Sequence, residues 1–179
     1  MDSRKVISIV GRQGAGKTTI GTLLANELGL KVIETSSVVK RQLGTKNPVK
    51  REQLAATGLR TIKDPNWLGK AITEEINGLS VVVLTGVREN EVHEYFSLHL
   101  RELIIIELCS PATVRYHRLK NLNKVANAEE FIAQDLRESR LGIERVLAHS
   151  TYQIQTTEET SPTEIVNTIK QFLKPILTS

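Results

Sequence analysis

Short apolar runs alternate along the chain with longer segments in which apolar residues recur at helical spacing. Runs at residues 6–10, 30–33, 80–84 and 103–108 are rich in Val, Ile and Leu and short enough to be buried strands, and 152–155 is a weaker fifth. Between them, spacings such as Ile20, Leu24 and Leu28 are typical of amphipathic helices. Strands that alternate with helices predict an α/β fold, a parallel sheet with helices on both faces.

Serine, aspartate, proline and glycine mark the expected helix ends. Ser36 or Ser37 can cap a helix that Gly44 ends, and Asp64-Pro65 begins another helix, which Gly78 closes. Residues 38–77 therefore form one helical region between the second and third strands. Further helices begin at 110–111, 128 and 161–162, and the polar segment 121–127 separates two of them.

The most specific motif follows the first predicted strand. Residues 11–18 read Gly-Arg-Gln-Gly-Ala-Gly-Lys-Thr, a complete phosphate-binding loop that opens a helix. Its glycines bring backbone N–H groups close to an anion, its lysine meets the β- and γ-phosphates, and its threonine hydroxyl suits Mg²⁺. A dinucleotide fingerprint is excluded because its third glycine would fall on Thr19. The expected nucleotide-binding residues are Gly11, Gln13, Gly14, Ala15, Gly16, Lys17, Thr18 and Thr19, with Thr18 as the metal ligand.

Composition narrows the function further. A chain of 179 residues fits one well-cored domain. The net charge is +4, the arginines lie in separate segments, and aromatic residues make up only 4%, so we expect a cleft for phosphates and no nucleic-acid partner. Cys109 is the single cysteine, which excludes an internal disulfide and fits a reducing compartment. Without a signal-peptide or membrane-span pattern, we expect a soluble cytoplasmic protein with no membrane partner.

Several segments should meet where the parallel strands end. Ligands of such sheets bind beyond the carboxyl ends of the strands. We expect that edge to gather residues 11–18, 34–37, 85–88, 109–111 and 155–158.

The order of these motifs resembles a known family. The phosphate-binding loop is followed by Arg41 and Arg60 in the helical region, by Thr-Gly-Val-Arg at 85–88, by Arg-x-x-Arg at 115–118, and by Asp-x-Arg-x-x-Arg at 135–140. Together these motifs resemble nucleoside monophosphate kinases over essentially the whole chain. Residues 64–67 and 86–91 look like deoxynucleoside monophosphate kinases of the phage type. Residues 130–142 and 152–154 look like small archaeal kinases related to the adenylate and dephospho-coenzyme A kinases.

The resemblance implies an architecture and a set of roles. It implies a P-loop NTPase three-layer α/β/α sandwich in one domain, residues 1–179, with a five-stranded parallel sheet of order 2-3-1-4-5. The core would be 1–37, 78–120 and 129–179, the acceptor-binding insertion about 38–77 and the lid about 121–128. ATP and Mg²⁺ would be the cofactors, and the acceptor a small phosphorylated molecule. Catalytic residues would be Lys17, Arg88, Arg118, Arg137 and Arg140; the acceptor would meet Glu34, Ser37, Arg41, Arg60 and Arg88.

Structural roles compete with these assignments. Arg137 and Arg140 could instead form solvated salt bridges with the nearby carboxylates of Asp135, Glu138 and Glu144. We expect Arg115 at the surface, and Arg41 and Arg60 could equally face water. Trp67 and the four histidines are expected to serve in packing or to lie at the surface.

The chain departs from the motifs of the resembled family at two places, and these departures leave the identity of the acceptor open. Thr85 stands where many of those kinases have Asp, and Ser36-Ser37 where related kinases have Gly-Asp. Our main hypothesis is a nucleoside or deoxynucleoside monophosphate kinase. The alternatives are a hydroxyl kinase of the dephospho-coenzyme A type, with Glu34 as the base, and a nucleotide-binding regulatory protein that has lost catalysis.

Overall fold

The structure is a computed structural model that describes residues 2–44, 63–140 and 142–177. Predicted acceptor residue Arg60 and the segment 45–62 of the expected insertion lie outside the described residues.

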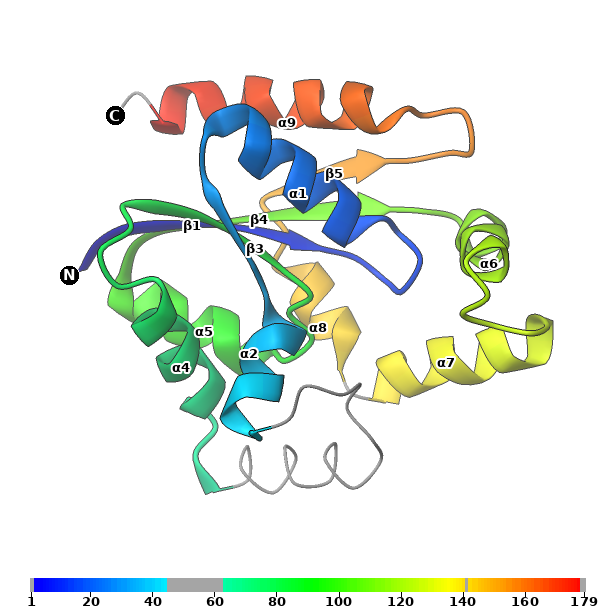
Figure 1. Ribbon diagram of the computed structural model, residues 1–179, viewed down its shortest axis with the longest axis horizontal. Coiled ribbons are helices and arrows are strands. Elements are labelled where there is room, and N and C mark those ends of the chain that lie inside the picture. Colours follow the sequence, from blue (N-terminus) through cyan, green and yellow to red (C-terminus); the bar gives the residue numbers. More distant parts are fainter. Residues whose placement is uncertain (1, 45–62, 141, 178–179) are drawn as a thin grey trace.

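A five-stranded parallel sheet forms the centre of the molecule (Figure 1). Its strands are β1 (Asp2–Val10), β2 (Lys31–Glu34), β3 (Val81–Thr85), β4 (Leu100–Cys109) and β5 (Tyr152–Gln155), in the order β2-β3-β1-β4-β5. All four strand pairs are parallel. The predicted order is therefore confirmed; β4 begins three residues before the apolar run because Leu100 already pairs with β1.

Helices cover both faces of the sheet, which confirms the three-layer sandwich (Figure 1). Helices α1 (Lys17–Leu28) and α9 (Pro162–Leu177) lie together on one face. On the other face lie α2 (Thr35–Gln42), α4 (Trp67–Glu75) and α5 (Asn90–His99), with the short helix α8 (Ile143–Ala148) against α5. The remaining helices, α6 (Ala112–Asn121) and α7 (Ala128–Arg140), lie beyond the carboxyl ends of the strands.

The apolar runs divide their side chains between two cores because successive strand residues face opposite sides. Ile7 and Ile9 of β1 pack with Leu24 of α1 under α9. Val6, one position away, packs with Phe96 of α5 in the other core. Trp67 packs against this second core, as expected. His93 is also buried there, where its Nε2 lies 2.9 Å from Ser8 Oγ, and burial lowers its pKa to about 4.

The turn between α6 and α7 occupies the predicted lid segment. Asn127 Oδ1 accepts a hydrogen bond from the Glu130 N–H at 2.9 Å, and the Glu130 carboxylate accepts one from the Ala126 N–H at 2.7 Å. Val125 is buried against Leu119 and Phe131. This local packing fixes where α7 begins; movement of the segment as a lid stays a prediction.

Helix α1 approaches β3 closely at Gly21. A Cβ at this position would lie 2.3 Å from Thr85 Cγ2, a β-branched and fully buried side chain that has little freedom to move. A glycine inside a helix ordinarily costs stability, so close packing explains its presence here.

We predict that Gly21→Ala lowers the free energy of unfolding by roughly 1–3 kcal/mol, because the added methyl group overpacks this contact. Urea unfolding of Gly21→Ala, Thr85→Ser and the double variant tests the contact. The double variant, which lacks the Thr85 methyl group, should regain most of the loss. A loss in the double variant as large as the sum of the single losses would place the clash elsewhere.

Candidate active site

The phosphate-binding loop connects the end of β1 to the start of α1. Gly16 is the N-cap residue of α1, with φ of 94°, and Gly14 has φ of 83°, conformations that suit glycine. A Cβ at Gly14 would lie 2.9 Å from the backbone oxygen of Arg115, so α6 can approach the loop only because this residue is glycine. The first N–H groups of α1 have no partner within the helix and create a favourable site for an anion.

Lys17 is the first residue of α1, at the end of this loop. Its Nζ donates a hydrogen bond to the backbone oxygen of Arg12 at 2.9 Å, so the side chain folds back along the loop. Burial lowers the pKa of Lys17 to about 8, with smaller opposing effects from Glu138, which raises it, and Arg88, which lowers it. The Lys17 amine is therefore mostly protonated at pH 7, but it loses its charge as the pH rises through about 8.

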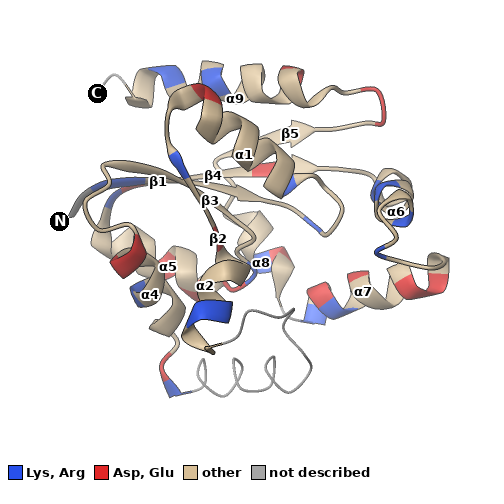
Figure 2. Cartoon of the chain, in the orientation of Figure 1, with Lys and Arg blue, Asp and Glu red and all other residues tan. Residues whose placement is uncertain are grey.

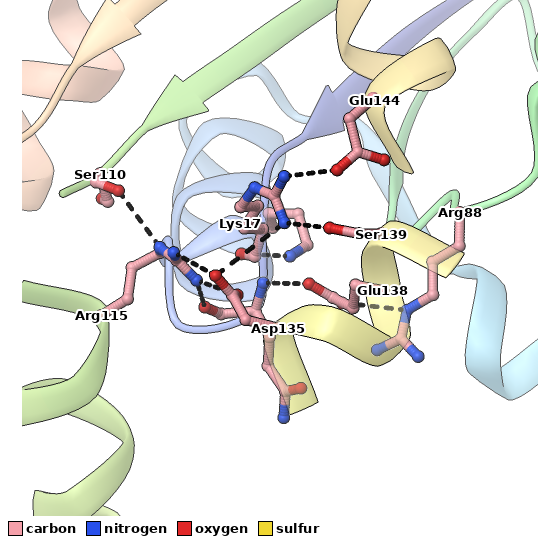
Figure 3. Close-up of polar contacts among 10 residues, drawn as sticks. Lys17, Arg88, Ser110, Arg115, Asp135, Glu138, Ser139 and Glu144 are labelled. Atoms are coloured by element: carbon pink, nitrogen blue, oxygen red, sulfur yellow. Dashed lines mark hydrogen bonds and ion pairs between the residues drawn. The ribbon is translucent and has the colours of Figure 1, made fainter. Parts of the chain in front are cut away.

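Arg115 joins three separate segments near the loop (Figure 3). The side chain is almost fully buried and donates to both carboxylate oxygens of Asp135 on α7, at 2.5 and 2.8 Å. It also donates to the backbone oxygens of Gln13 and Ser110, each at 3.2 Å. Hydrogen bonding to Arg115 is the main reason that the pKa of Asp135 is lowered. Our expectation that Arg115 lies at the surface is therefore wrong.

Glu138, one turn after Asp135 on α7, reaches the same loop residue from the other side (Figure 3). Its Oε2 accepts a hydrogen bond from the backbone N–H of Gln13 at 2.8 Å. Its Oε1 lies 3.6 Å from Nε of Arg88, and only 5% of the Glu138 side chain is exposed, against 50% of the Arg88 side chain. Gln13 is therefore held by α7 at its N–H directly and at its C=O through Arg115.

Two further arginines attach the loop to its surroundings. Arg12 donates to Glu144 Oε1 at 2.6 Å and to Ser139 Oγ at 3.1 Å. Arg118 donates to the Thr157 backbone oxygen at 2.9 Å and to Ser110 Oγ at 3.2 Å, with Ala15 O at 3.5 Å. Arg118 thus lies beside the phosphate-binding loop, and its expected role on the donor phosphates stays a prediction.

Arg137 and Arg140 lie apart from this cluster. Both are exposed on α7, and neither makes a hydrogen bond or ion pair with another residue in the described part of the chain. The alternative of surface ion pairs is wrong, because the proposed partners Asp135, Glu138 and Glu144 face the loop instead. Acidic and basic residues are mixed along this helix (Figure 2), and its acidic residues at 135 and 138 share the buried side.

A cavity of about 480 Å³ lies next to the loop, along β2 and the start of α1, and reaches the carboxyl end of β3. Predicted acceptor residues Glu34, Ser37 and Arg41 line it, and Thr18 borders it from the loop. Arg41 forms two hydrogen bonds with the carboxylate of Glu75 across the cavity rim. Residues beyond our predicted set complete the lining: Thr22, Lys31, Val32, Ile33, Glu75 and Thr85.

Oxygen ligands suitable for Mg²⁺ border the same cavity. They are the Thr18 hydroxyl, the Glu34 carboxylate and the hydroxyl of Thr85, which is buried without a hydrogen-bond partner among the described residues. The described residues contain no group of three or more His, Cys, Asp and Glu side chains that could hold a metal ion. This set fits Mg²⁺, which takes few protein ligands and keeps water and phosphate oxygens for the rest.

Known proteins match the chain over nearly its whole length. A family model described as shikimate kinase matches residues 13–174. A shikimate kinase of Methylococcus capsulatus is 28% identical over 182 residues, covering 97% of this chain and 96% of the relative. Shikimate kinase 2 of Shigella boydii is 27% identical over 178 residues, covering 92% and 93%.

Solved structures agree with the observed architecture. A shikimate kinase from Acinetobacter baumannii in complex with shikimate superposes with a TM-score of 0.68 at 19% identity, covering 96% of this chain and 93% of the other. At this identity the likeness shows the fold alone. Among the described helices, none is long and apolar enough to cross a membrane.

The lowered pKa of Lys17 predicts how nucleotide affinity depends on pH. Below pH 8 the amine is charged in the free protein, whereas above pH 8 a proton must be taken up before the charge can meet a phosphate. Calorimetry with MgATP should show that the Kd rises by up to about tenfold per pH unit above pH 8. Lys17→Ala should bind weakly with no such rise, and a flat wild-type profile up to pH 9.5 would contradict the assignment.

Substitution of Arg115 should remove contacts of the loop and lower the free energy of unfolding. Arg115→Ala leaves Asp135 without its main partner, and we predict a loss of roughly 2–3 kcal/mol in the free energy of unfolding, less than for a fully buried pair. Urea unfolding measures this loss. Arg101→Ala, an exposed arginine at the start of β4, should change stability by less than about 0.5 kcal/mol. Equal effects of the two variants would show that Arg115 has no special structural role.

Proposed function

The chain belongs to the shikimate kinase family and is an ATP-dependent kinase of the P-loop fold, and we propose that its acceptor is a hydroxyl group of a small molecule. The expected use of ATP and Mg²⁺ is confirmed, because kinases of this family use both. Our main hypothesis from the sequence, a nucleoside monophosphate acceptor, receives no support from these relatives. They favour the alternative of a hydroxyl kinase.

The observation that carries the proposal is the carboxylate of Glu34 in the cavity beside Thr18. A hydroxyl that attacks a phosphoryl group must lose its proton, and a nearby carboxylate can accept it. A nucleoside monophosphate attacks through an oxygen that is already ionised and does not need such a base. Glu34 accepts a hydrogen bond from Ser36 Oγ at 2.9 Å, is exposed to the cavity and is in register with Thr85 of β3.

The cationic residues around the loop can stabilise the charge that develops on the transferred phosphoryl group. As the acceptor oxygen forms its bond to the γ-phosphorus and ADP leaves, negative charge spreads over the transferred group. Lys17 and Arg118 neutralise charge on the side of the loop, while Arg88 at the end of β3 does so on the side facing the acceptor. Guanidinium groups serve here because their fixed fork of donors matches phosphate oxygens.

The charges of the cavity favour a hydroxylated acceptor that carries a carboxylate, as shikimate does. Arg41 already holds the carboxylate of Glu75 with two hydrogen bonds. An acceptor carboxylate can replace Glu75 on this guanidinium with the same geometry. Shikimate is therefore the first acceptor to test, and other small hydroxy acids follow.

Mass-spectrometric product detection tests the proposed acceptor class. The protein is incubated with ATP and Mg²⁺ against shikimate, other hydroxy acids, dephospho-coenzyme A and nucleoside monophosphates, with Lys17→Ala as the inactive control. We expect a phosphate ester of a hydroxylated acceptor. A nucleoside diphosphate that forms from a monophosphate, and no ester, would overturn the proposal.

The role of Glu34 gives a separate prediction for the active acceptor. Glu34→Gln should lower kcat by about 10²-fold, since general base catalysis typically contributes a factor of this order or more, and leave the KM for ATP within about threefold. Glu27→Gln, which removes a carboxylate from α1 on the side facing α9, is the matched control and should keep the wild-type kcat. Wild-type kcat in Glu34→Gln would exclude Glu34 as the base.

A further inference from the structure

Glu138 is a buried carboxylate whose partners are phosphate-binding groups. It accepts the N–H of Gln13 in the phosphate-binding loop at 2.8 Å and lies 3.6 Å from Nε of Arg88 (Figure 3). Its negative charge also raises the pKa of Lys17, against the larger lowering by burial. A buried carboxylate is stable only where such partners compensate its charge.

We propose that Glu138 is an internal phosphate mimic that occupies the anion site of the loop in the free protein and leaves Gln13 when a nucleoside triphosphate binds. The proposal concerns regulation of the kinase site and rests on the proposed function. The loop holds anions through backbone N–H groups, a helix N-terminus and a lysine, and the Glu138 carboxylate accepts one of these N–H groups, that of Gln13. A triphosphate brings several negative charges into this site and therefore repels Glu138.

The surrounding contacts allow Glu138 to leave while α7 stays attached. Asp135, one turn earlier, remains bound to Arg115 through two hydrogen bonds, and Arg115 holds the Gln13 C=O from α6. Release of Glu138 thus requires a rotamer change or a small rotation of α7 about this pair. It also separates Arg88 from its carboxylate partner, so that the charge of this half-exposed guanidinium can act on a phosphate.

A role for Glu138 as the general base is less well supported. The cavity beside Thr18 is lined by Glu34 and Glu75 but does not include Glu138. Glu138 instead lies on the side of the loop covered by α7, where it contacts backbone and arginine. Its position suits competition with phosphate more than proton transfer from an acceptor.

Nucleotide binding, measured without any acceptor, tests the mimic independently of the reaction. By titration calorimetry with MgATP at pH 7, Glu138→Gln should bind about tenfold tighter than the wild type, because the competing charge is gone while its amide oxygen still accepts the Gln13 N–H. Glu129→Gln removes the same charge from an exposed position on α7 and should stay within about twofold of the wild type. Unchanged or weaker binding by Glu138→Gln would overturn the proposal.

The wild-type protein provides a second measurement that does not depend on a variant. Two NMR resonances should shift when MgATP saturates the site: that of the Glu138 carboxyl carbon and that of the Gln13 amide. Both should shift because the hydrogen bond between these groups is broken. A carboxyl resonance of Glu138 that stays constant through saturation would show that Glu138 remains on the loop. Tighter binding together with no transfer to any acceptor would support the mimic and remove only the proposed acceptor class.

Discussion

The attachment of α7 to Gln13 is the constraint that sets the geometry of this site in the free protein. Two acidic residues one turn apart hold both polar groups of a single loop residue: Glu138 takes the N–H, and Asp135 positions Arg115 on the C=O. Through this residue, α6 and α7 are fixed relative to β1 and α1. The glycine at position 14 makes the arrangement possible, since any side chain there would meet the backbone of α6.

The phosphate-binding loop and the cavity proposed for the acceptor lie at neighbouring strands of the parallel sheet. The end of β1 and the start of α1 provide the anion site, while the ends of β2 and β3 border the cavity with Glu34 and Arg41. Arg88 follows β3 and lies beside Glu138 of α7. Phosphoryl transfer needs little beyond such placement and neutralised charge, so a small domain with one ordered strand edge is sufficient.

The sequence predicted the fold and the loop because both depend on local patterns. Apolar runs and helical spacings indicated the five strands, the family resemblance implied their order, and residues 11–18 form the loop as expected. The environments of Arg115, Asp135 and Glu138 could not be predicted in this way, since they depend on pairing between residues 20 to 125 positions apart. The three-residue spacing of Asp135 and Glu138 indicated one shared helix face, but not which face meets the loop. Arg137 and Arg140 are exposed on the same helix, and their expected contact with the donor phosphates stays a prediction.

Phosphorus NMR of the complete reaction tests the central claim, transfer to a hydroxyl, most directly. With ATP, Mg²⁺ and an active acceptor, the account predicts a growing single resonance of a phosphate monoester alongside the resonances of ADP. The new resonance should show no phosphorus–phosphorus coupling, because the phosphate of a monoester is not bonded to a second phosphate. A new pair of coupled resonances from a second nucleoside diphosphate, with no monoester signal, would contradict the account and return the acceptor to the nucleoside monophosphates.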